Sequence, residues 1–291
     1  ITRDSRLPLA KAQGPHHFVA ALGMIWNANL PQQSTKETLE DLLTALTRSE
    51  TEFFGKLDQA SGRFVLIYQI NGAIFVCGDA TAMKSIMYSE RVPGVIASHG
   101  GLLSKMIAAE KSSTALTIMS SEKWKLPQSR YLPGSLTEWQ DIHYLTANTK
   151  INLNSGEIER FWPRQPISQS SLLDVAERVS NLMHSQMAWL KTQERPLLMS
   201  LTAGIDSRVA FSIASQYEDI EYFTYSDGVS AAHIEDCEVA AELAISQGKQ
   251  HRILPVSKNE DQKVIERIKA NNRISHLPHV ASSYLRHFPQ D

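Results

Sequence analysis

The sequence predicts two domains, an N-terminal α+β domain and a C-terminal α/β domain built on a parallel sheet. In the C-terminal part, an apolar strand runs into a polar turn and a helix over residues 196–208, and a strand, a helix and a third strand follow up to residue 256. Such alternation is typical of a parallel sheet. In the N-terminal part, β-like runs are bounded by the turn dipeptides Asn71-Gly72 and Pro93-Gly94. A length of 291 residues suits two domains.

Two amphipathic helices are predicted from apolar residues at helical spacing. The first runs from Thr35 to about Thr47. The second is capped by Ser170 or Ser171 and runs to about Lys191. Its expected apolar face consists of Leu172, Val175, Val179, Leu182 and Met183.

The segment 163–169 is the least structured part of the pattern, and we interpret it as a linker. The expected domains are therefore residues 1–162 and 170–291. In the second domain we predict a strand at Ile220–Tyr225, a helix at Glu235–Ser246 and a strand at Arg252–Val256. Ligands of such sheets bind outside the carboxyl ends of the strands.

The turn between the first strand and its helix, residues 202–207, is the candidate site. Backbone N–H groups and the positive end of the helix dipole converge there, as an anion requires. Gly204 lets the backbone approach a ligand closely, and Thr202 and Ser207 offer hydroxyl donors. Asp206 is expected to coordinate a metal or to hold the turn by accepting N–H bonds. The alternative is an ordinary βα connection with a polar helix cap.

This turn resembles the pyrophosphate-binding loop (PP-loop) of the N-type ATP pyrophosphatases, Ser-Gly-Gly-x-Asp-Ser. Thr202 takes the place of the first serine and Ala203 that of the first glycine, whereas Gly204, Asp206 and Ser207 match. The two departures are conservative, although Ala203 narrows the φ range of the turn.

With its surroundings, the turn resembles the asparagine synthetase family, in which a synthetase domain follows an Ntn-type glutamine amidotransferase domain. Further segments that carry the resemblance are 57–58, 62–68, 78–88, 97–98, 133–134, 161–162, 223–225 and 236–244, with Gly248 and His251. The resemblance implies a degenerate N-terminal Ntn-type αββα sandwich. It also implies a truncated C-terminal doubly wound parallel sheet of the adenine-nucleotide alpha-hydrolase type.

The resemblance also implies a reaction. A carboxylate, that of aspartate or an analogue, is activated by ATP as an acyl-adenylate, pyrophosphate leaves, and ammonia or another amine forms the amide. Asp206 and Ser207 are the candidate catalytic residues, ATP and Mg²⁺ the implied cofactors, and Asp206 the candidate Mg²⁺ ligand. The implied nucleotide-binding residues are Leu201, Thr202, Ala203, Gly204, Asp206, Ser207, Phe223, Thr224 and Tyr225, with adenine at Leu201 and 223–225. Backbone donors at 203–207 would stabilise the charge on the phosphates.

Glutaminase activity is not expected. Members of the family that hydrolyse glutamine use an N-terminal cysteine, whereas this sequence begins Ile1-Thr2-Arg3 and lacks the Asn-Gly-Glu segment that binds glutamine. We expect Cys77 and Cys237 to be small buried residues.

Three weaker patterns keep their ordinary explanations beside the functional ones. The pairs His16-His17 and His276-x-x-His279 are either metal ligands or, as we expect, solvated surface residues. Arg208 contacts phosphate or makes a salt bridge. Asp236 and Glu238 either help to organise Mg²⁺ or are acids of the first helical turn.

Composition is consistent with a cytosolic two-domain protein but decides little about its function. A formal net charge of -2 gives no reason to expect a nucleic-acid or membrane partner, and no stretch approaches transmembrane length. Two cysteines offer neither a disulfide framework nor a zinc pattern. We expect a cytoplasmic protein, whose implied substrates by the family resemblance are a small carboxylate and an amine, and leave a homodimer open.

Three functions stay open: an asparagine-synthetase-like ligase of asparagine biosynthesis, a nucleotide-binding pseudoenzyme or scaffold, and a lactam or peptide cyclase. The family's acidic, glycine-rich motif, resembling Ser-Gly-x-Gly-x-Asp-Glu, does not occur before Asp291. We therefore expect the chain to be the front portion of a longer protein, one that binds adenine nucleotide weakly and does not catalyse exchange of pyrophosphate with ATP by itself.

Overall fold

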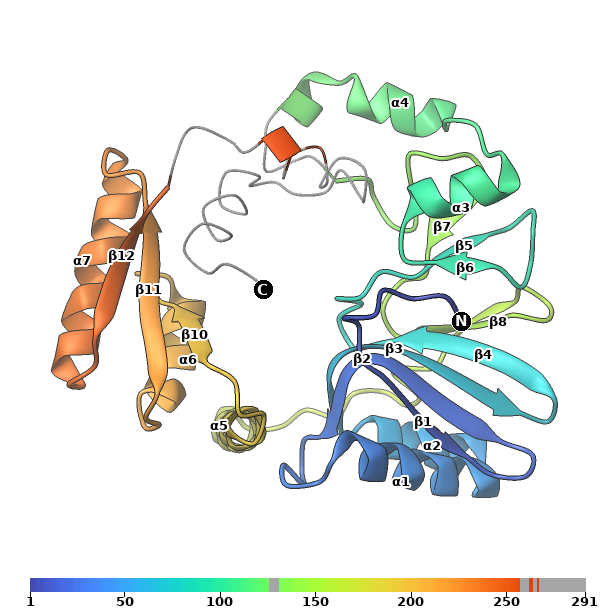
Figure 1. Cartoon of the computed structure of the whole chain (residues 1–291), viewed down its shortest axis with the longest axis horizontal. Helices are drawn as coiled ribbons and strands as arrows, with labels where there is room; N and C mark the ends of the chain where they lie inside the picture. The colour runs from blue at the N-terminus through green and yellow to red at the C-terminus, as the bar shows by residue number, and fades with distance from the viewer. Residues whose placement is uncertain (126–130, 257–261, 264–265, 267–291) are drawn as a thin grey trace. The chain divides into compact units, whose positions relative to one another are not determined.

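The computed structural model describes residues 1–125, 131–256, 262–263 and 266. The chain divides into two compact units, Ile1–Gln169 and Ser170–Asp291 (Figure 1). The first unit contains β1 (Leu9–Gln13), β2 (Phe18–Asn27), α1 (Thr35–Arg48), α2 (Glu50–Leu57), β3 (Ala60–Ile70), β4 (Ala73–Gly78), β5 (Met87–Ser89), β6 (Ile96–Ala97), α3 (Gly100–Ile107), α4 (Ser113–Met119), the 3₁₀ helix η1 (Glu122–Lys125), β7 (Ile142–Tyr144), β8 (Thr149–Asn152) and β9 (Ile158–Arg160).

Two sheets form the middle of the first unit. One has six antiparallel strands in the order β1-β2-β3-β4-β8-β9, and the other has three in the order β6-β5-β7. The turn Asn71-Gly72 joins β3 to β4 with both residues at positive φ, 51° and 80°. These angles are those of a type I′ hairpin turn, as the Asn-Gly dipeptide predicts.

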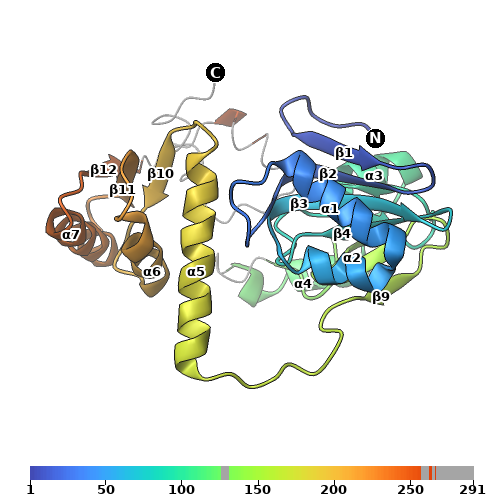
Figure 2. The same ribbon diagram turned by 90° about the horizontal axis from the view of Figure 1, so that it is seen from below.

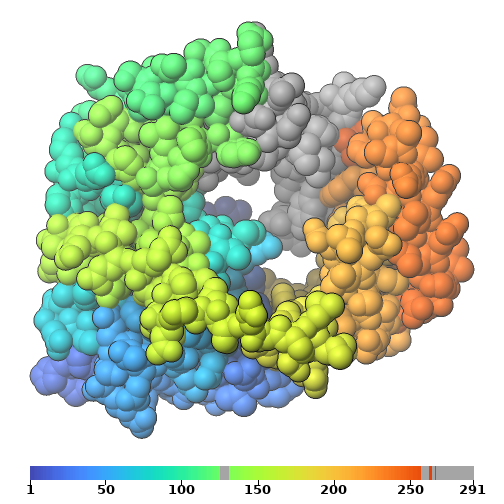
Figure 3. Space-filling view, turned by 180° about the vertical axis from the view of Figure 1, so that it is seen from behind, coloured from blue at the N-terminus to red at the C-terminus, as the bar shows by residue number. Residues whose placement is uncertain are grey.

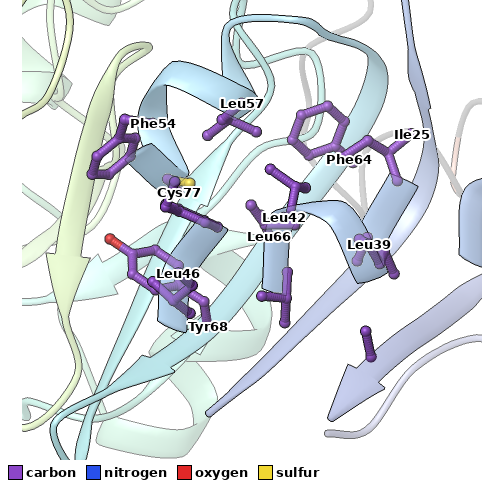
Figure 4. Packing of buried hydrophobic residues seen from close by; sticks show 14 residues of the cluster. Ile25, Leu39, Leu42, Leu46, Phe54, Leu57, Phe64, Leu66, Tyr68 and Cys77 are labelled. Carbon is purple, nitrogen blue, oxygen red and sulfur yellow. The ribbon is translucent and has the colours of Figure 1, made fainter. Parts of the chain in front are cut away.

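One face of the six-stranded sheet is covered by α1 and α2 (Figure 4). Helix α1 begins at a capping box, in which Ser34 and Glu37 satisfy each other's backbone N–H groups. Its buried side chains Leu39, Leu42 and Leu46 recur at helical spacing and pack against Leu66 and Tyr68 of β3. The predicted helix is therefore confirmed to within a residue.

The opposite face of this sheet packs on the smaller sheet, so the unit has four layers. Ile67, Val76 and Ile151 form one core cluster with Ile86 and Tyr88. Beyond the smaller sheet, a further cluster joins Met87 and Ile142 to Leu103 of α3. In Figure 1, α1 and α2 lie on the outer side of the large sheet and α3 on the outer side of the small one. The layering is thus the expected αββα.

A buried lysine ties the far edge of the large sheet to α2. Lys150 of β8 is 5% exposed, and its ammonium group lies 2.7 Å from Glu50 Oε1 and 3.0 Å from Glu159 Oε2. The Tyr68 hydroxyl donates to the same Glu50 oxygen at 2.9 Å. A buried charge needs such partners, so this network fixes how β8 and β9 sit against the helix.

The second unit contains α5 (Leu172–Lys191), β10 (Leu197–Ser200), α6 (Ile205–Ala214), β11 (Ile220–Ser226), α7 (Ala231–Ser246) and β12 (His251–Pro255). The strands form a parallel sheet in the order β10-β11-β12. Helices α5, α6 and α7 contribute to one core cluster with Tyr222, and Figure 2 shows α6 and α7 on the same side of the strands. The described residues thus give helices on one face, and the doubly wound sheet stays a prediction.

Two sequence-based expectations for this unit are wrong. Helix α7 begins at Ala231, four residues before the predicted Glu235, so its first turn holds no acidic residue. In α5, the expected apolar face is not buried: Leu172 is 83% exposed, and Val175, Val179 and Leu182 are also exposed. The helix packs instead through its C-terminal half, where Met187 joins the core and Trp189 is buried.

The connection between the units is exposed. Residues 162–171 are exposed at every position, and the yellow-green segment leading into α5 lies on the surface (Figure 3). Ser171 caps α5 by accepting a hydrogen bond from the N–H of Asp174. Of the two serines proposed as cap, Ser171 is therefore the one that serves.

One buried carboxylate organises the loop that follows β4. Asp79 is 2% exposed and accepts hydrogen bonds from the N–H groups of Phe64, Thr81, Met83 and Lys84 and from the Thr81 hydroxyl. This loop leads into β5, so a single side chain connects the large sheet to the small one.

We predict that Asp79→Ala destabilises the protein by about 2–4 kcal/mol, because four backbone donors lose their acceptor. The exposed pair of Asp58 with Arg164 offers a matched control, and Asp58→Ala should cost no more than about 1 kcal/mol. Urea unfolding of the two variants checks this. Equal losses of unfolding free energy would contradict the role given to Asp79.

Candidate phosphate-binding site

The turn between β10 and α6 forms where a parallel strand ends and its helix begins. β10 ends at Ser200 and α6 starts at Ile205, with Gly204 as N-cap in extended backbone, φ -64° and ψ 146°. Any residue adopts these angles, so the requirement for glycine at 204 is not torsional. It concerns space: a Cβ there would lie 3.2 Å from the Thr202 hydroxyl oxygen.

Two hydroxyl groups hold the turn closed. The Ser207 hydroxyl oxygen accepts from the N–H of Thr202 at 3.1 Å and lies 3.0 Å from the carbonyl oxygens of both Thr202 and Gly204. The Thr202 hydroxyl oxygen accepts from the N–H of Gly204 at 3.1 Å and lies 3.0 Å from the Ser207 hydroxyl. Both side chains predicted to face the anion are therefore engaged within the turn.

Asp236 reaches the same turn from the neighbouring helix. Its Oδ1 accepts a hydrogen bond of 2.9 Å from the N–H of Ala203. Asp236 lies in the second turn of α7 and is half-buried. Asp236 and Glu238 are thus not first-turn helix acids, which was one of the two explanations that the sequence offered. Glu238 is exposed. Because sequence spacing does not show which face of α7 meets the turn, this contact could not be predicted.

Three N–H groups at the start of α6 remain for an anion. The N–H groups of Ile205, Asp206 and Ser207 have no acceptor among the described residues, and the next one, that of Arg208, bonds to Gly204 O at 3.2 Å. The predicted set of donors, 203–207, is thereby reduced, since Ala203 and Gly204 already have partners. Three converging N–H groups at a helix N-terminus suit a phosphate oxygen.

Two charged side chains stand beside these donors. Asp206 and Arg208 are both exposed, and neither has an ion pair or hydrogen bond from its side chain within the part of the chain described. The turn is held by Thr202, Ser207 and Asp236, so Asp206 does not serve the turn-holding role considered for it. Its carboxylate is available to a cation.

The positions expected to line adenine differ in accessibility. Leu201 is fully buried in the core cluster, and its N–H donates to Phe223 O at 2.9 Å. Phe223 is buried and Tyr225 half-buried on the face of β11 that points away from Tyr222, with ring centroids 5.3 Å apart. The adenine contacts at these positions stay a prediction.

Thr224 of β11 makes hydrogen bonds to Leu201, which follows β10, and to His251 of β12. Its buried hydroxyl donates to Leu201 O and lies 2.8 Å from His251 Nε2. Because the hydroxyl hydrogen is used on the carbonyl, His251 must donate from Nε2. Burial lowers the pKa of His251. The hydrogen bonds of Thr224 connect β11 and β12 to Leu201, the residue that follows β10, directly before the turn.

A second turn follows β11 at the same edge of the sheet. Asp227 accepts from the N–H groups of Ser230 and Val229, and these bonds, with His233 at 3.1 Å, lower its pKa to about 2. The carboxylate therefore satisfies the loop that enters α7. His233 precedes Asp236 by three residues, so both lie on one side of that helix.

The other candidate residues belong to other parts of the sequence. His16 and His17 line a hollow of about 560 Å³ at the hairpin ends of the large sheet, and His276 and His279 lie outside the described residues. Within the described ranges, no group of three or more His, Cys, Asp or Glu side chains is placed to hold a metal ion. Cys77 and Cys237 are both buried, as predicted, and burial raises the pKa of the Cys77 thiol to about 12.

Comparisons with known proteins give distant similarities alone. No family model matches the chain, and no curated protein matches it. Among solved structures, the glutamine phosphoribosylpyrophosphate amidotransferase of B. subtilis, complexed with ADP and GMP, is 13% identical with a TM-score of 0.30, covering 75% of this chain and 47% of its own. A structure described as the allosteric regulatory enzyme of purine biosynthesis is 11% identical with a TM-score of 0.32, covering 92% and 61%.

This chain thus spans less than two thirds of the length of either protein. Similarity at this level establishes neither a shared fold nor a shared activity, so the architecture depends on the layers and strand order described above. No helix in the described residues is long and apolar enough to cross a membrane.

The burial of His251 gives a prediction about pH. The folded protein holds the pKa of His251 below its ordinary value of 6.5, so the unfolded chain takes up the proton first as pH falls. Stability from this group is fully present above about pH 6.5 and is lost below it.

We therefore expect the urea midpoint to fall between pH 7.5 and pH 5.0, and to fall less in His251→Gln, which keeps an N–H donor but does not titrate. An identical decline in both proteins would show that other groups are responsible.

Proposed function

We propose that the chain is the nucleotide-binding part of an ATP-dependent, amide-forming ligase of the asparagine synthetase type. The observation that carries the proposal is the set of three N–H groups without acceptors at residues 205–207, at the end of a parallel strand whose turn resembles a pyrophosphate-binding loop. In this role they bind phosphate oxygens of ATP and stabilise charge on the departing pyrophosphate.

The reaction has two steps. An oxygen of the substrate carboxylate attacks the α-phosphorus, the bond to the bridging oxygen breaks, and pyrophosphate leaves with that electron pair. An amine then attacks the acyl carbon, AMP leaves, and the amine gives up a proton. Aspartate is the first candidate for the carboxylate and ammonia for the amine, on the family resemblance.

Asp206 fits a magnesium ligand that acts together with ATP. Its carboxylate is exposed, next to the free N–H groups, and without a side-chain partner among the described residues. Mg²⁺ in phosphate sites is commonly bound through one or two carboxylates, the phosphates and water. The bound ion would supply positive charge against the phosphates. Arg208, one residue further along, is free to add to that charge.

A second candidate, a nucleotide-binding scaffold without catalysis, has one observation in its favour. The hydroxyl groups of Thr202 and Ser207 are satisfied within the turn, so the turn is stable without a ligand. Both proposals predict nucleotide binding, and only the ligase predicts exchange of pyrophosphate.

For binding, we predict that Gly204→Val abolishes ATP affinity while the fold is retained, because the branched side chain displaces the Thr202 hydroxyl and crowds the turn. Titration calorimetry measures the affinity, and circular dichroism checks the fold. Gly14→Val is the control, since a Cβ at Gly14 would meet only His17 O at 3.8 Å. Unchanged ATP binding in folded Gly204→Val would remove the phosphate assignment.

For catalysis, we predict exchange of labelled pyrophosphate into ATP that depends on Mg²⁺ and on a carboxylate such as aspartate. The assay is run on this chain and on any longer native form. Loss of a single aimed donor costs about a hundredfold or more in rate, so the exchange rate is sensitive to whether the phosphate site is complete. We expect Asp206→Asn to lower the exchange rate in whichever form is active. Nucleotide binding without exchange in either form would favour the scaffold.

A further inference from the structure

The hydrogen bond from the N–H of Ala203 to Asp236 connects the candidate site to helix α7. Ala203 stands in the turn after β10, and Asp236 on the helix that links β11 to β12. Helix α7 packs on both of these strands, and Ala240, one turn beyond Asp236, is fully buried in the core. The carboxylate is therefore held by a fixed helix, and it fixes the turn in consequence.

The negative charge of Asp236 is unfavourable beside a site for an anion. A carboxylate 2.9 Å from a backbone nitrogen of this turn repels any phosphate bound at the next three N–H groups. It also removes the Ala203 N–H from the donors available to an anion. By its charge and by its use of the Ala203 N–H, Asp236 weakens anion binding. Its favourable contribution is therefore the geometry of the turn that its hydrogen bond fixes.

The Thr202–Ala203 peptide is the part of the turn whose orientation this bond sets. The hydroxyls of Thr202 and Ser207 satisfy the N–H groups of Thr202 and Gly204, and the N–H of Ala203 is satisfied by Asp236. With that bond absent, the peptide is free to rotate. Rotation there moves Gly204 and with it the direction of the N–H groups at 205–207.

We propose that Asp236 is a positioning residue that orients the 202–207 turn so that the N–H groups of Ile205, Asp206 and Ser207 converge on one phosphate. This inference depends on the proposed function for the ligand and on the observed hydrogen bond for the role. In this role Asp236 acts through the Ala203 N–H and not through the nucleotide itself.

Two variants separate the acceptor from the charge. Asp236→Ala removes both and should weaken binding of ATP and of inorganic pyrophosphate about tenfold, the change that one hydrogen bond to a charged group carries. Asp236→Asn keeps a side-chain oxygen as acceptor and removes the negative charge, so its affinity should equal or exceed that of the unmodified protein. Calorimetry measures each, with unfolding midpoints as the check on folding.

Glu238→Ala is the matched control, because it removes one negative charge from an exposed position on the same helix without touching the turn. Its affinity should also equal or exceed that of the unmodified protein. If Asp236→Ala behaves like Glu238→Ala, or if Asp236→Asn loses as much affinity as Asp236→Ala, the positioning role is wrong.

Hydrogen exchange in the nucleotide-free protein tests the same role without a ligand. The Ala203 amide should exchange about tenfold faster in Asp236→Ala and at an unchanged rate in Asp236→Asn. An unmodified protein that binds neither ATP nor pyrophosphate would remove the proposed function. The exchange rates would still decide whether Asp236 holds the turn, and equal rates in all three proteins would overturn that claim.

Discussion

The candidate site depends on one requirement, that the backbone N–H groups of the turn after β10 find acceptors. A parallel strand ends there and a helix begins, so the N–H groups of six successive residues, 202–207, have no backbone carbonyl as acceptor among the described residues. Thr202, Ser207 and Asp236 satisfy the first three donors, and the last three before Arg208 stay open. The division into satisfied and open donors defines where an anion fits.

A small number of buried polar groups also holds the N-terminal unit together. Four layers bring strands and helices into contact through apolar side chains, but the connections between layers are made by a few buried polar groups. Asp79 gathers five donors at the exit of β4, and Lys150 is held between Glu50 and Glu159. Buried groups of this kind are costly unless paired, so they select one arrangement of the layers.

Much of the local structure could be predicted because it follows from short-range chemistry. Ser34 and Glu37 specify where α1 starts, and Asn71-Gly72 specifies the hairpin between β3 and β4. The succession of strands and helices from 197 to 255 follows from apolar periodicity. Prediction failed where packing decides: α5 has an apolar stripe at helical spacing, yet Leu172, Val175, Val179 and Leu182 remain exposed.

By itself, the sequence determined that a strand, a hydroxyl-rich turn and a helix follow one another at residues 197–214, and this succession places amide donors and a helix dipole together whatever surrounds them. Tertiary structure alone decided which donors are open. Asp236 lies 33 residues from Ala203, and Thr224 and His251 lie 27 residues apart. Contacts over such distances depend on strand order and on which helix face meets the turn, and periodicity along the chain carries no information about either.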